Sequence, residues 1–387
     1  MFKSFLFNTP EIIFGIDAIL EVGVEAKKLG AKKVLFISGN NVKKNGYVEK
    51  VEELLKKEGI EVLTLLESRR TPEPTTDLPE SAAKLAKEEN VDAIIGMGGG
   101  SVLDVAKMTA ALMTNPLGTR DYFGKEKVLN KAIPSILIPT TSGTGSEVTK
   151  HAIFLDEENN VKKAVASSNI MPTVAIIDPM TTLTCPQIVT ANTGFDAFLH
   201  AAEPILSTRS SILTDTIALK AISIISRWLG PAYADGNNVE ARYNMALGSL
   251  LAGLVLNNAG TSLVHALAYP IGGEFHVPHG PSLTGLVNSC FDYIMVAKQE
   301  KFAEIAEAMG EVTQGISERE AAQLGLKAID NLMNIVNLPT TLTALEITDK
   351  SKVDRWAEEA FMEKRLLGRA ARNLSLEDIK NIYLNAF

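Results

Sequence analysis

The 387-residue chain is 46% hydrophobic and 22% charged, with a formal net charge of −8 at pH 7. This length allows two domains with separate cores, and the acidic balance argues against nucleic acid as a partner. No apolar run reaches the roughly 20 residues of a membrane span, and two cysteines, Cys185 and Cys290, imply no disulfide framework. We therefore expect a cytoplasmic globular protein that acts on a small molecule.

Five short hydrophobic runs rich in β-branched residues recur in the first half of the chain. Such runs, apolar throughout and without alternation, are typical of buried parallel strands. They cover residues 34–37, 62–66, 93–97, 136–138 and 174–177. Helix-patterned segments, such as 48–57 and 81–89, lie between them. The alternation predicts a doubly wound, Rossmann-like parallel α/β domain over residues 1–180.

A glycine-rich segment, Gly98-Gly99-Gly100-Ser101, follows the third of these strands and precedes a helix-like run at 102–112. Three glycines let a ligand approach the backbone closely, and a helix N-terminus attracts phosphate. A tight turn capped by Ser101 would explain the same residues. The segment is neither the spaced GxGxxG motif nor a Walker loop.

A second polar loop, TTSGTGSEVT at residues 140–149, directly follows the strand expected at 136–138. Its six hydroxyl groups and two glycines form a surface that suits a pyrophosphate and a carboxamide. A polar turn capped by Ser146 or Thr149 is the alternative. Because the two loops follow neighbouring predicted strands, together they favour one extended anionic ligand, such as a dinucleotide, at the switch point of the sheet.

Strand-like runs become scarce after residue 180, and helical periodicity replaces them. The helical segments are expected at residues 192–199, 215–229, 239–256, 263–268, 297–309, 318–336 and 353–367. We therefore predict an all-helical second domain over residues 181–387. A cleft between the two domains is the expected ligand site.

Four side chains of the second domain are candidate metal ligands. Asp196 and His200 are four residues apart in GFDAFLH and would share one helix face, although a structural Asp–His hydrogen bond would use the same spacing. His265 lies in a predicted helix, and His279 closes a segment, 271–280, that we expect to be a loop. Together the four supply one oxygen and three nitrogens, which suits Fe²⁺ or Zn²⁺ and leaves room for a substrate oxygen.

Five motifs follow one another along almost the whole chain, and together they resemble the iron-containing (group III) alcohol dehydrogenase family. They are GGGSVLDVAK (98–107), TTSGTGSEVT (140–149), Asp178-Pro179, GFDAFLH (194–200) and HALAYPIGGEFHVPHG (265–280). The resemblance implies a dinucleotide-binding domain and a helical domain whose metal is held by Asp196, His200, His265 and His279. It also implies a pyrophosphate at Gly98, Gly99, Gly100 and Ser101, and cofactor contacts from Thr140, Thr141, Thr144, Thr149, Lys162 and Leu183.

One departure from the family concerns the cofactor. Members that use NAD often carry an aspartate where this chain has Gly39, followed here by Asn40 and the nearby Lys43 and Lys44. A carboxylate would repel a ribose 2′-phosphate, whereas glycine with lysines would accept it. We expect NADP, with NAD as the second choice; a plain turn with solvated lysines would explain the same residues.

Two further departures concern the substrate side. Some members have another histidine four residues after the third ligand, where this chain has Tyr269. Either Tyr269 or His276 could relay a proton instead, and an imidazole such as His276 has an ordinary pKa closer to neutral. Pro204 should end or kink the helix that carries His200, and residues near it could shape the substrate pocket.

The resemblance implies a metal-dependent, NAD(P)-linked alcohol dehydrogenase or aldehyde reductase. Hydride would pass between the nicotinamide and a small primary alcohol or aldehyde held at the metal. The alternatives on the same architecture are a hydroxyacid–oxoacid transhydrogenase and a lyase similar to dehydroquinate synthase. The resemblance also suggests a homo-oligomer, a dimer or larger, with residues 7–14 as an edge-strand contact.

Overall fold

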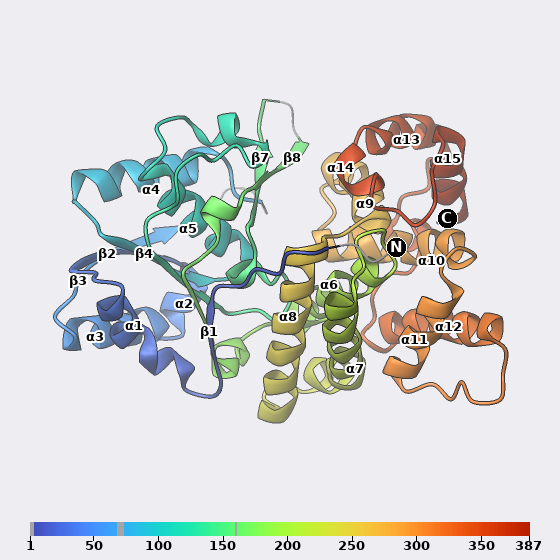
Figure 1. Cartoon of the computed structure of the whole chain (residues 1–387), viewed down its shortest axis with the longest axis horizontal. Helices are drawn as coiled ribbons and strands as arrows, with labels where there is room; N and C mark the ends of the chain where they lie inside the picture. Colours follow the sequence, from blue (N-terminus) through green and yellow to red (C-terminus); the bar gives the residue numbers. More distant parts are fainter. Residues whose placement is uncertain (1–3, 68–72, 159–160) are drawn as a thin grey trace. The chain divides into compact units, whose positions relative to one another are not determined.

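The computed structural model describes residues 4–67, 73–158 and 161–387, which form two compact units (Figure 1). One unit runs from Asn8 to Cys185 and contains the strands. The other runs from Pro186 to Phe387, is built from helices, and also takes in the described residues before Asn8. The expected fold class, a parallel α/β part followed by a helical part, is confirmed.

A six-stranded parallel sheet lies at the centre of the first unit, in the order β1-β9-β6-β4-β2-β3. The five strands expected from the apolar runs are all present, and β1 adds an edge. The strands are β1 (Glu11–Phe14), β2 (Lys33–Gly39), β3 (Glu61–Glu67), β4 (Ala93–Gly98), β6 (Ser135–Pro139) and β9 (Val174–Ile177).

Helices cover both faces of this sheet because successive strand residues point to opposite sides. Leu35 and Ile37 pack with the buried residues of α4 and α5, whereas Val34 and Phe36 pack with those of α1 and α3. The helices are α1 (Val22–Lys28), α2 (Asn40–Lys44), α3 (Tyr47–Lys57), α4 (Asp77–Glu88) and α5 (Gly100–Leu112). The expected doubly wound arrangement follows from these two cores.

A small second sheet, in the order β5-β8-β7, was not expected from the sequence. Its strands are β5 (Gly124–Lys125), β7 (His151–Asp156) and β8 (Val161–Ala166), and β7 pairs with β8 in antiparallel fashion. Buried Ala152, Phe154 and Asp156 alternate with partly buried neighbours in β7. The burial therefore alternates along β7, unlike that of the central strands, although residues 152–155 form a short apolar run.

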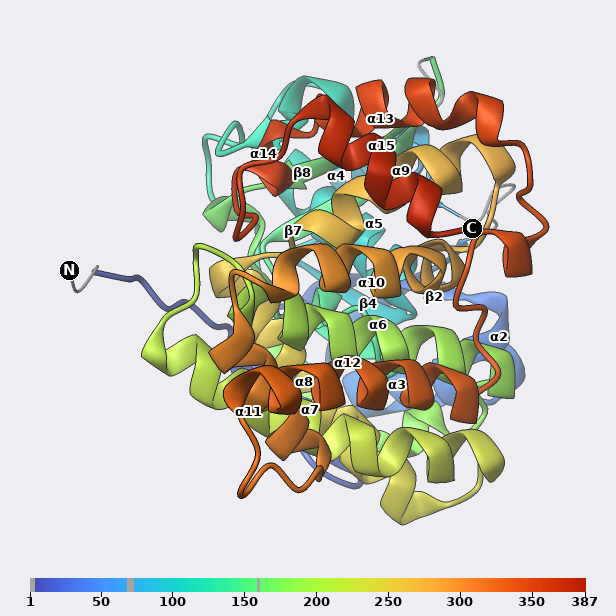
Figure 2. The ribbon, with the colours of Figure 1, turned by 90° about the vertical axis from the view of Figure 1, so that its right-hand side faces the viewer.

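The second unit consists of helices, shown face-on in Figure 2. Helix α10 packs against α6, α9 and α12. The helices are α6 (Gln187–Ile205), α7 (Ile212–Ala234), α8 (Val239–Ala259), α9 (Leu263–Phe275), α10 (His279–Met295), α11 (Gln299–Met309), α12 (Glu318–Ile335), α13 (Val353–Phe361), α14 (Lys364–Leu367) and α15 (Leu376–Asn385).

The remaining helical elements among the described residues are short 3₁₀ helices. They span Ala18–Glu21, Thr119–Tyr122, Ser146–Val148, Ser168–Ile170, Pro179–Thr182, Thr343–Leu345 and Lys350–Lys352. Among the described residues, no helix on its own has the length and apolar composition to cross a membrane. Helices α8 and α9 reach that length and apolar composition only when they are counted together as one segment, and the two helices are bent by 99° relative to each other.

The segment 271–280, expected to be a loop, is mostly helical. Helix α9 continues through Pro270 and two glycines to Phe275, and α10 begins at His279. A proline inside a helix removes one backbone hydrogen bond, but this turn is held by packing, because Pro270, Ile271 and Gly272 are buried against the helical core. By contrast, α6 ends at Ile205, directly after Pro204, as expected.

Candidate metal centre and cofactor loops

Helix α6 presents the first two candidate ligands. Asp196 and His200 are one turn apart on a buried face, and His200 Nε2 lies 3.3 Å from Asp196 Oδ1. A Cβ at Gly194 would come within 2.4 Å of the Leu229 side chain of α7. The glycine therefore lets α7 pack closely against α6, which fixes the helix just before Asp196.

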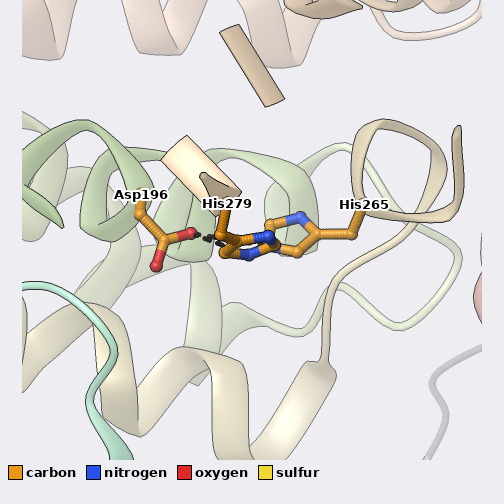
Figure 3. A group of neighbouring side chains, drawn as sticks. All are labelled: Asp196, His265 and His279. Carbon is orange, nitrogen blue, oxygen red and sulfur yellow. Dashed lines mark ion pairs between the residues drawn. The ribbon is translucent and has the colours of Figure 1, made fainter. Parts of the chain in front are cut away.

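Two other helices bring the remaining candidates to the same carboxylate. His265 Nε2, on α9, lies 3.5 Å from Asp196 Oδ1, and His279 Nε2, at the start of α10, lies 3.7 Å from it (Figure 3). A Cβ at Gly280 would lie 2.8 Å from that of Asn192. Glycine at this position thus allows α10 to begin directly against α6 and sets the position of His279.

The ligand atoms match the requirements of a divalent metal ion. One atom each from Asp196, His265 and His279 lie within 4.8 Å of one another, and the ring of His200 stacks on that of His265 with centroids 5.3 Å apart. Four tetrahedral ligands about 2.1 Å from an ion lie about 3.4 Å from each other. Distances of 3.3–3.7 Å to Asp196 Oδ1 agree with that spacing.

Two buried atoms at the centre of this group lack hydrogen bonds. Asp196 Oδ1 and His265 Nε2 make none of acceptable geometry with any described residue. A buried polar atom without a partner is costly, and a cation between these two would satisfy both. The residues present therefore fit a divalent ion.

The electrostatics of the group also call for a positive charge. Burial disfavours the charged form of Asp196, but the three imidazoles outweigh it and hold the pKa of this carboxyl well below its usual range. Burial likewise opposes protonation of His265, yet the carboxylates of Glu203 and Asp196 raise its pKa to about 9. A metal ion would replace the proton that these carboxylates attract to Nε2.

Glu203 is a site residue that the sequence analysis did not assign. It lies on α6 three residues after His200 and is buried. One carboxylate oxygen accepts a hydrogen bond from His265 Nδ1, and the other accepts one from the backbone N–H of Val264 at 2.7 Å. With its proton on Nδ1, the imidazole turns Nε2 toward Asp196. The i, i+3 spacing from His200 was the available signal.

The exposed fractions of the four candidate side chains show from which side solvent reaches the group. The side chain of His279 is 34% exposed, whereas those of Asp196, His200 and His265 are 5–7% exposed. A substrate atom could therefore approach from the side of His279.

The two candidate proton donors differ in their surroundings. Tyr269 lies one turn after His265 on α9, so both side chains share a helix face. Burial raises the pKa of the Tyr269 hydroxyl, although the Arg365 guanidinium opposes the shift. His276 is exposed at the C-terminal end of α9, with a positive φ of 53°.

In the other unit, the two polar loops expected to bind phosphate lie side by side. The N–H of Thr140, just after β6, donates to the carbonyl of Gly98 at the end of β4, over 2.9 Å. A Cβ at Gly100 would lie 2.7 Å from the Thr144 side chain, so only glycine allows this approach. Gly99 precedes α5, and Gly100 and Ser101 form its first turn.

A buried charged group lies beneath these loops. Lys107, fully buried on α5, pairs with Asp104 at 3.0 Å and donates to the carbonyl of His151. Asp104 in turn accepts from Ser146 Oγ at 2.6 Å. Thr149 is also buried, and its hydroxyl lies 3.4 Å from Lys107 Nζ. These contacts fasten the loop at 140–149 to α5.

The remaining cofactor candidates lie at strand ends of the same unit. Gly39 ends β2, the neighbour of β4, and Asn40 begins α2. After β2 the chain forms β3 on one side of β2 and then returns to form β4 on its other side. The order in which strands are added to the sheet therefore reverses between β2 and β4. Lys162 lies on β8 and pairs with Glu73 at 2.6 Å. Leu183 is partly buried after the 3₁₀ helix Pro179–Thr182.

Two family models match the chain and together account for nearly all of it. Residues 9–179 match the family described as iron-containing alcohol dehydrogenase. Residues 190–387 match the C-terminal part of the Fe-containing alcohol dehydrogenase family.

Individual relatives agree with these matches. Long-chain-alcohol dehydrogenase 1 of Geobacillus thermodenitrificans (strain NG80-2) is 39% identical, with 96% of this chain and 94% of that protein covered. The NAD-dependent methanol dehydrogenase of Bacillus methanolicus is 32% identical, with 98% and 99% covered. A solved structure of 1,3-propanediol oxidoreductase superposes with a TM-score of 0.95 at 34% identity and covers 100% of both chains.

Proposed function

The chain belongs to the iron-containing alcohol dehydrogenase family, and from this we propose that it interconverts a small primary alcohol and its aldehyde with a nicotinamide cofactor. The observation that carries the proposal is the buried Asp196 Oδ1, which lacks a hydrogen bond and has three imidazole nitrogens 3.3–3.7 Å away. One of these nitrogens, His265 Nε2, also lacks a hydrogen bond. Asp196, His200, His265 and His279 would hold the metal, with Fe²⁺ as first choice and Zn²⁺ as second.

A divalent ion supplies a Lewis acid that polarises the C–O group of the substrate. The protein contributes fixed ligands, and Glu203 holds the imidazole of His265 with Nε2 toward Asp196. In reduction, the aldehyde carbon gains a hydride from the nicotinamide and its oxygen gains a proton. We assign the proton to the hydroxyl of Tyr269, which shares a helix face with His265; His276 is the alternative donor.

We propose NADP as the preferred cofactor and NAD as the second choice. A Cβ at Gly39 would meet only the Val102 side chain, at 3.9 Å, so the strand end has space for a larger group. Lys43 and Lys44 are exposed nearby, and their charges would favour a 2′-phosphate. The relative named as NAD-dependent shows that NAD use occurs among similar chains. The cofactor would lie along Gly98–Ser101 and the loop at 140–149.

A homo-oligomer is also proposed. Strand β1 lies at an edge of the sheet and pairs only with β9. An unpaired strand edge is a ready surface for a second copy, and Phe5 and Leu6 just before it are 53% and 74% exposed. Light scattering combined with size-exclusion chromatography would measure the mass, and a monomer at micromolar concentration would refute the oligomer.

A spectrophotometric screen tests the activity directly. Short alcohols, diols and aldehydes are assayed with NADP(H) and NAD(H), anaerobically, with ferrous ion or zinc ion added. We expect stoichiometric oxidation of the reduced cofactor by an aldehyde. The transhydrogenase and lyase alternatives are not favoured by the relatives, and turnover without net consumption of cofactor would be needed to restore them. No consumption with any aldehyde would contradict the proposed function.

A further inference from the structure

Three arginines in the helical unit have no role in the site described above. They are Arg209, which follows α6, Arg365 on α14 and Arg369 just after α14. No carboxylate among the described residues lies within 4 Å of their guanidinium groups. Their charges are therefore not paired within the described part of the chain.

The guanidinium of Arg369 lies at the N-terminal end of α9, the helix that carries His265. Its Nη1 donates to the carbonyl of Thr261 at 3.1 Å. A Cβ at Gly260 would come 1.9 Å from this nitrogen, so the glycine, with φ of 76°, leaves room for the guanidinium. The Arg369 guanidinium is therefore held at Thr261, four residues before the proposed metal ligand His265.

The other two arginines lie close to the first. The Thr208 N–H donates to the carbonyl of Arg369 at 2.8 Å, which places Arg209 beside it. Helix α14 packs against α9, and the positive charge of Arg365 lies near enough to the Tyr269 hydroxyl to oppose the rise of its pKa. Burial, followed by the nearby charges of Arg365 and Arg209, lowers the pKa of Arg369 to about 10.

An unpaired polar atom lies in the same stretch of chain. Ser262, between Thr261 and α9, is 5% exposed, and its hydroxyl has no hydrogen-bond partner among the described residues. It also provides no side-chain cap for α9. The Glu203 carboxylate lies near Arg369 and Tyr269 but already accepts hydrogen bonds from Val264 and His265.

These contacts together describe a surface suited to an anion. Partly buried positive charges that no carboxylate contacts directly are costly until an anion binds. Arginine is the side chain best suited to carboxylate, sulfonate and phosphate groups because its fork of N–H groups binds two oxygens at once.

We infer that Arg365 and Arg369, with Tyr269 between them and His265, form a subsite for an anionic group on the substrate. The inference rests on the proposed function and specifies its substrate class: a short alcohol or aldehyde that carries a carboxylate, sulfonate or phosphate. His265 and Tyr269 are one helical turn apart, about 5–6 Å. A chain of roughly two to four atoms would therefore separate the reacting carbon from the anionic group.

The test compares an anionic aldehyde with a neutral one of the same length. We expect the holoenzyme to reduce 4-oxobutanoate with a higher kcat/KM than butanal. In Arg369→Met and Arg365→Met, the ratio of the two kcat/KM values should fall roughly 10-fold to 100-fold, as expected when a charged hydrogen-bonding partner is lost. The matched control is Arg227→Met, on the exposed face of α7, and it should keep the ratio.

A binding measurement tests the subsite even in variants that lose activity. Succinate, the acid that corresponds to 4-oxobutanoate, is titrated calorimetrically into the holoenzyme of the wild type and of the two variants, with circular dichroism to verify folding. Binding to the wild type that is lost in the folded variants supports the subsite. An unchanged substrate ratio, or equal succinate binding by all three proteins, overturns it. If neither 4-oxobutanoate nor butanal is reduced, the proposed function fails instead.

Discussion

At the scale of single residues, the site depends on which nitrogen of His265 carries the proton. Glu203 accepts from Nδ1 and from the N–H of Val264, so it orients the ring and caps the start of α9 at once. The same residue joins α6, which carries Asp196 and His200, to α9. A buried carboxylate in this position serves both the proposed metal ligand His265 and the junction between the two helices.

Replacing Glu203 should therefore weaken metal binding. In Glu203→Gln, the amide NH₂ would face Nδ1 and favour the proton on Nε2, and we expect metal affinity to fall about 10-fold to 100-fold. Competition with a chelator, using Co²⁺ or Zn²⁺, measures it without any assay of turnover. Glu359→Gln, exposed on α13, is the matched control. Equal affinities in the two variants would show that Glu203 does not position His265.

The residue at position 39 should decide cofactor choice. In Gly39→Asp, a carboxylate at the end of β2 would repel the 2′-phosphate and accept the ribose hydroxyls. We expect the ratio of kcat/KM for NADPH over NADH to fall by at least about 10-fold, corresponding to roughly 1.4 kcal/mol. Steady-state kinetics with both cofactors measure it. An unchanged ratio would show that Gly39 does not face the ribose.

Two substitutions distinguish the two candidate proton donors. Tyr269→Phe removes the hydroxyl of the residue one helical turn after His265, and His276→Ala removes the exposed imidazole at the end of α9. We expect Tyr269→Phe to lower kcat roughly 10²-fold or more, with metal content unchanged, and His276→Ala to have the smaller effect. A pH profile of kcat is the accompanying readout. The reverse order of effects would assign the proton to His276.

At the scale of elements, the loop at 140–149 is held by buried charges. Lys107 and Asp104 bind it from α5, and Glu147 in the 3₁₀ helix Ser146–Val148 is buried beside them. Burial raises the pKa of Glu147 to about 7, although its hydrogen bonding and Lys107 oppose the shift. The loop that we assign to the cofactor therefore contains a group that titrates near neutral pH.

This carboxyl should make stability depend on pH. The pKa in the folded state, about 7, lies above the ordinary glutamate value of 4.5. Its contribution to stability is therefore full below about pH 4.5 and is lost as the pH rises through 7. Glu147→Gln should raise the free energy of unfolding at pH 8 by about 2 kcal/mol more than at pH 5. Urea titrations at both pH values measure it, with the exposed Glu157→Gln as control. No difference between the pH values would contradict the raised pKa.

At the scale of the whole molecule, the four proposed metal ligands all belong to the unit at 186–387, and the cofactor candidates all belong to the unit at 8–185. We therefore expect chelation to abolish turnover and to leave NADPH affinity within about 3-fold of its original value. Fluorescence of bound NADPH measures the affinity, and re-addition of Fe²⁺ or Zn²⁺ should restore turnover. Turnover by a protein verified as metal-free would refute the Lewis-acid role.

The sequence alone predicted the five central strands, the parallel sheet and the helical second part, because apolar runs and helical periodicity are local properties of the chain. It missed β7 and β8, and it failed at the segment 271–280, where three glycines and Pro278 suggested a loop. Packing of α9 within the buried core outweighed those local preferences. β7 contains the short apolar run 152–155, but only the antiparallel pairing with β8 establishes the two segments as strands.

The local sequence determined which side chains were available: an aspartate and a histidine one helical turn apart, two further histidines, and two polar loops after predicted strands. Only the tertiary structure decided that Asp196, His265 and His279 meet, that Glu203 orients His265, and that Arg365 and Arg369 flank the same helix. The reason is physical. Distances between residues far apart in sequence are set by how helices pack, and here glycines at 194, 260 and 280 determine how closely those groups approach.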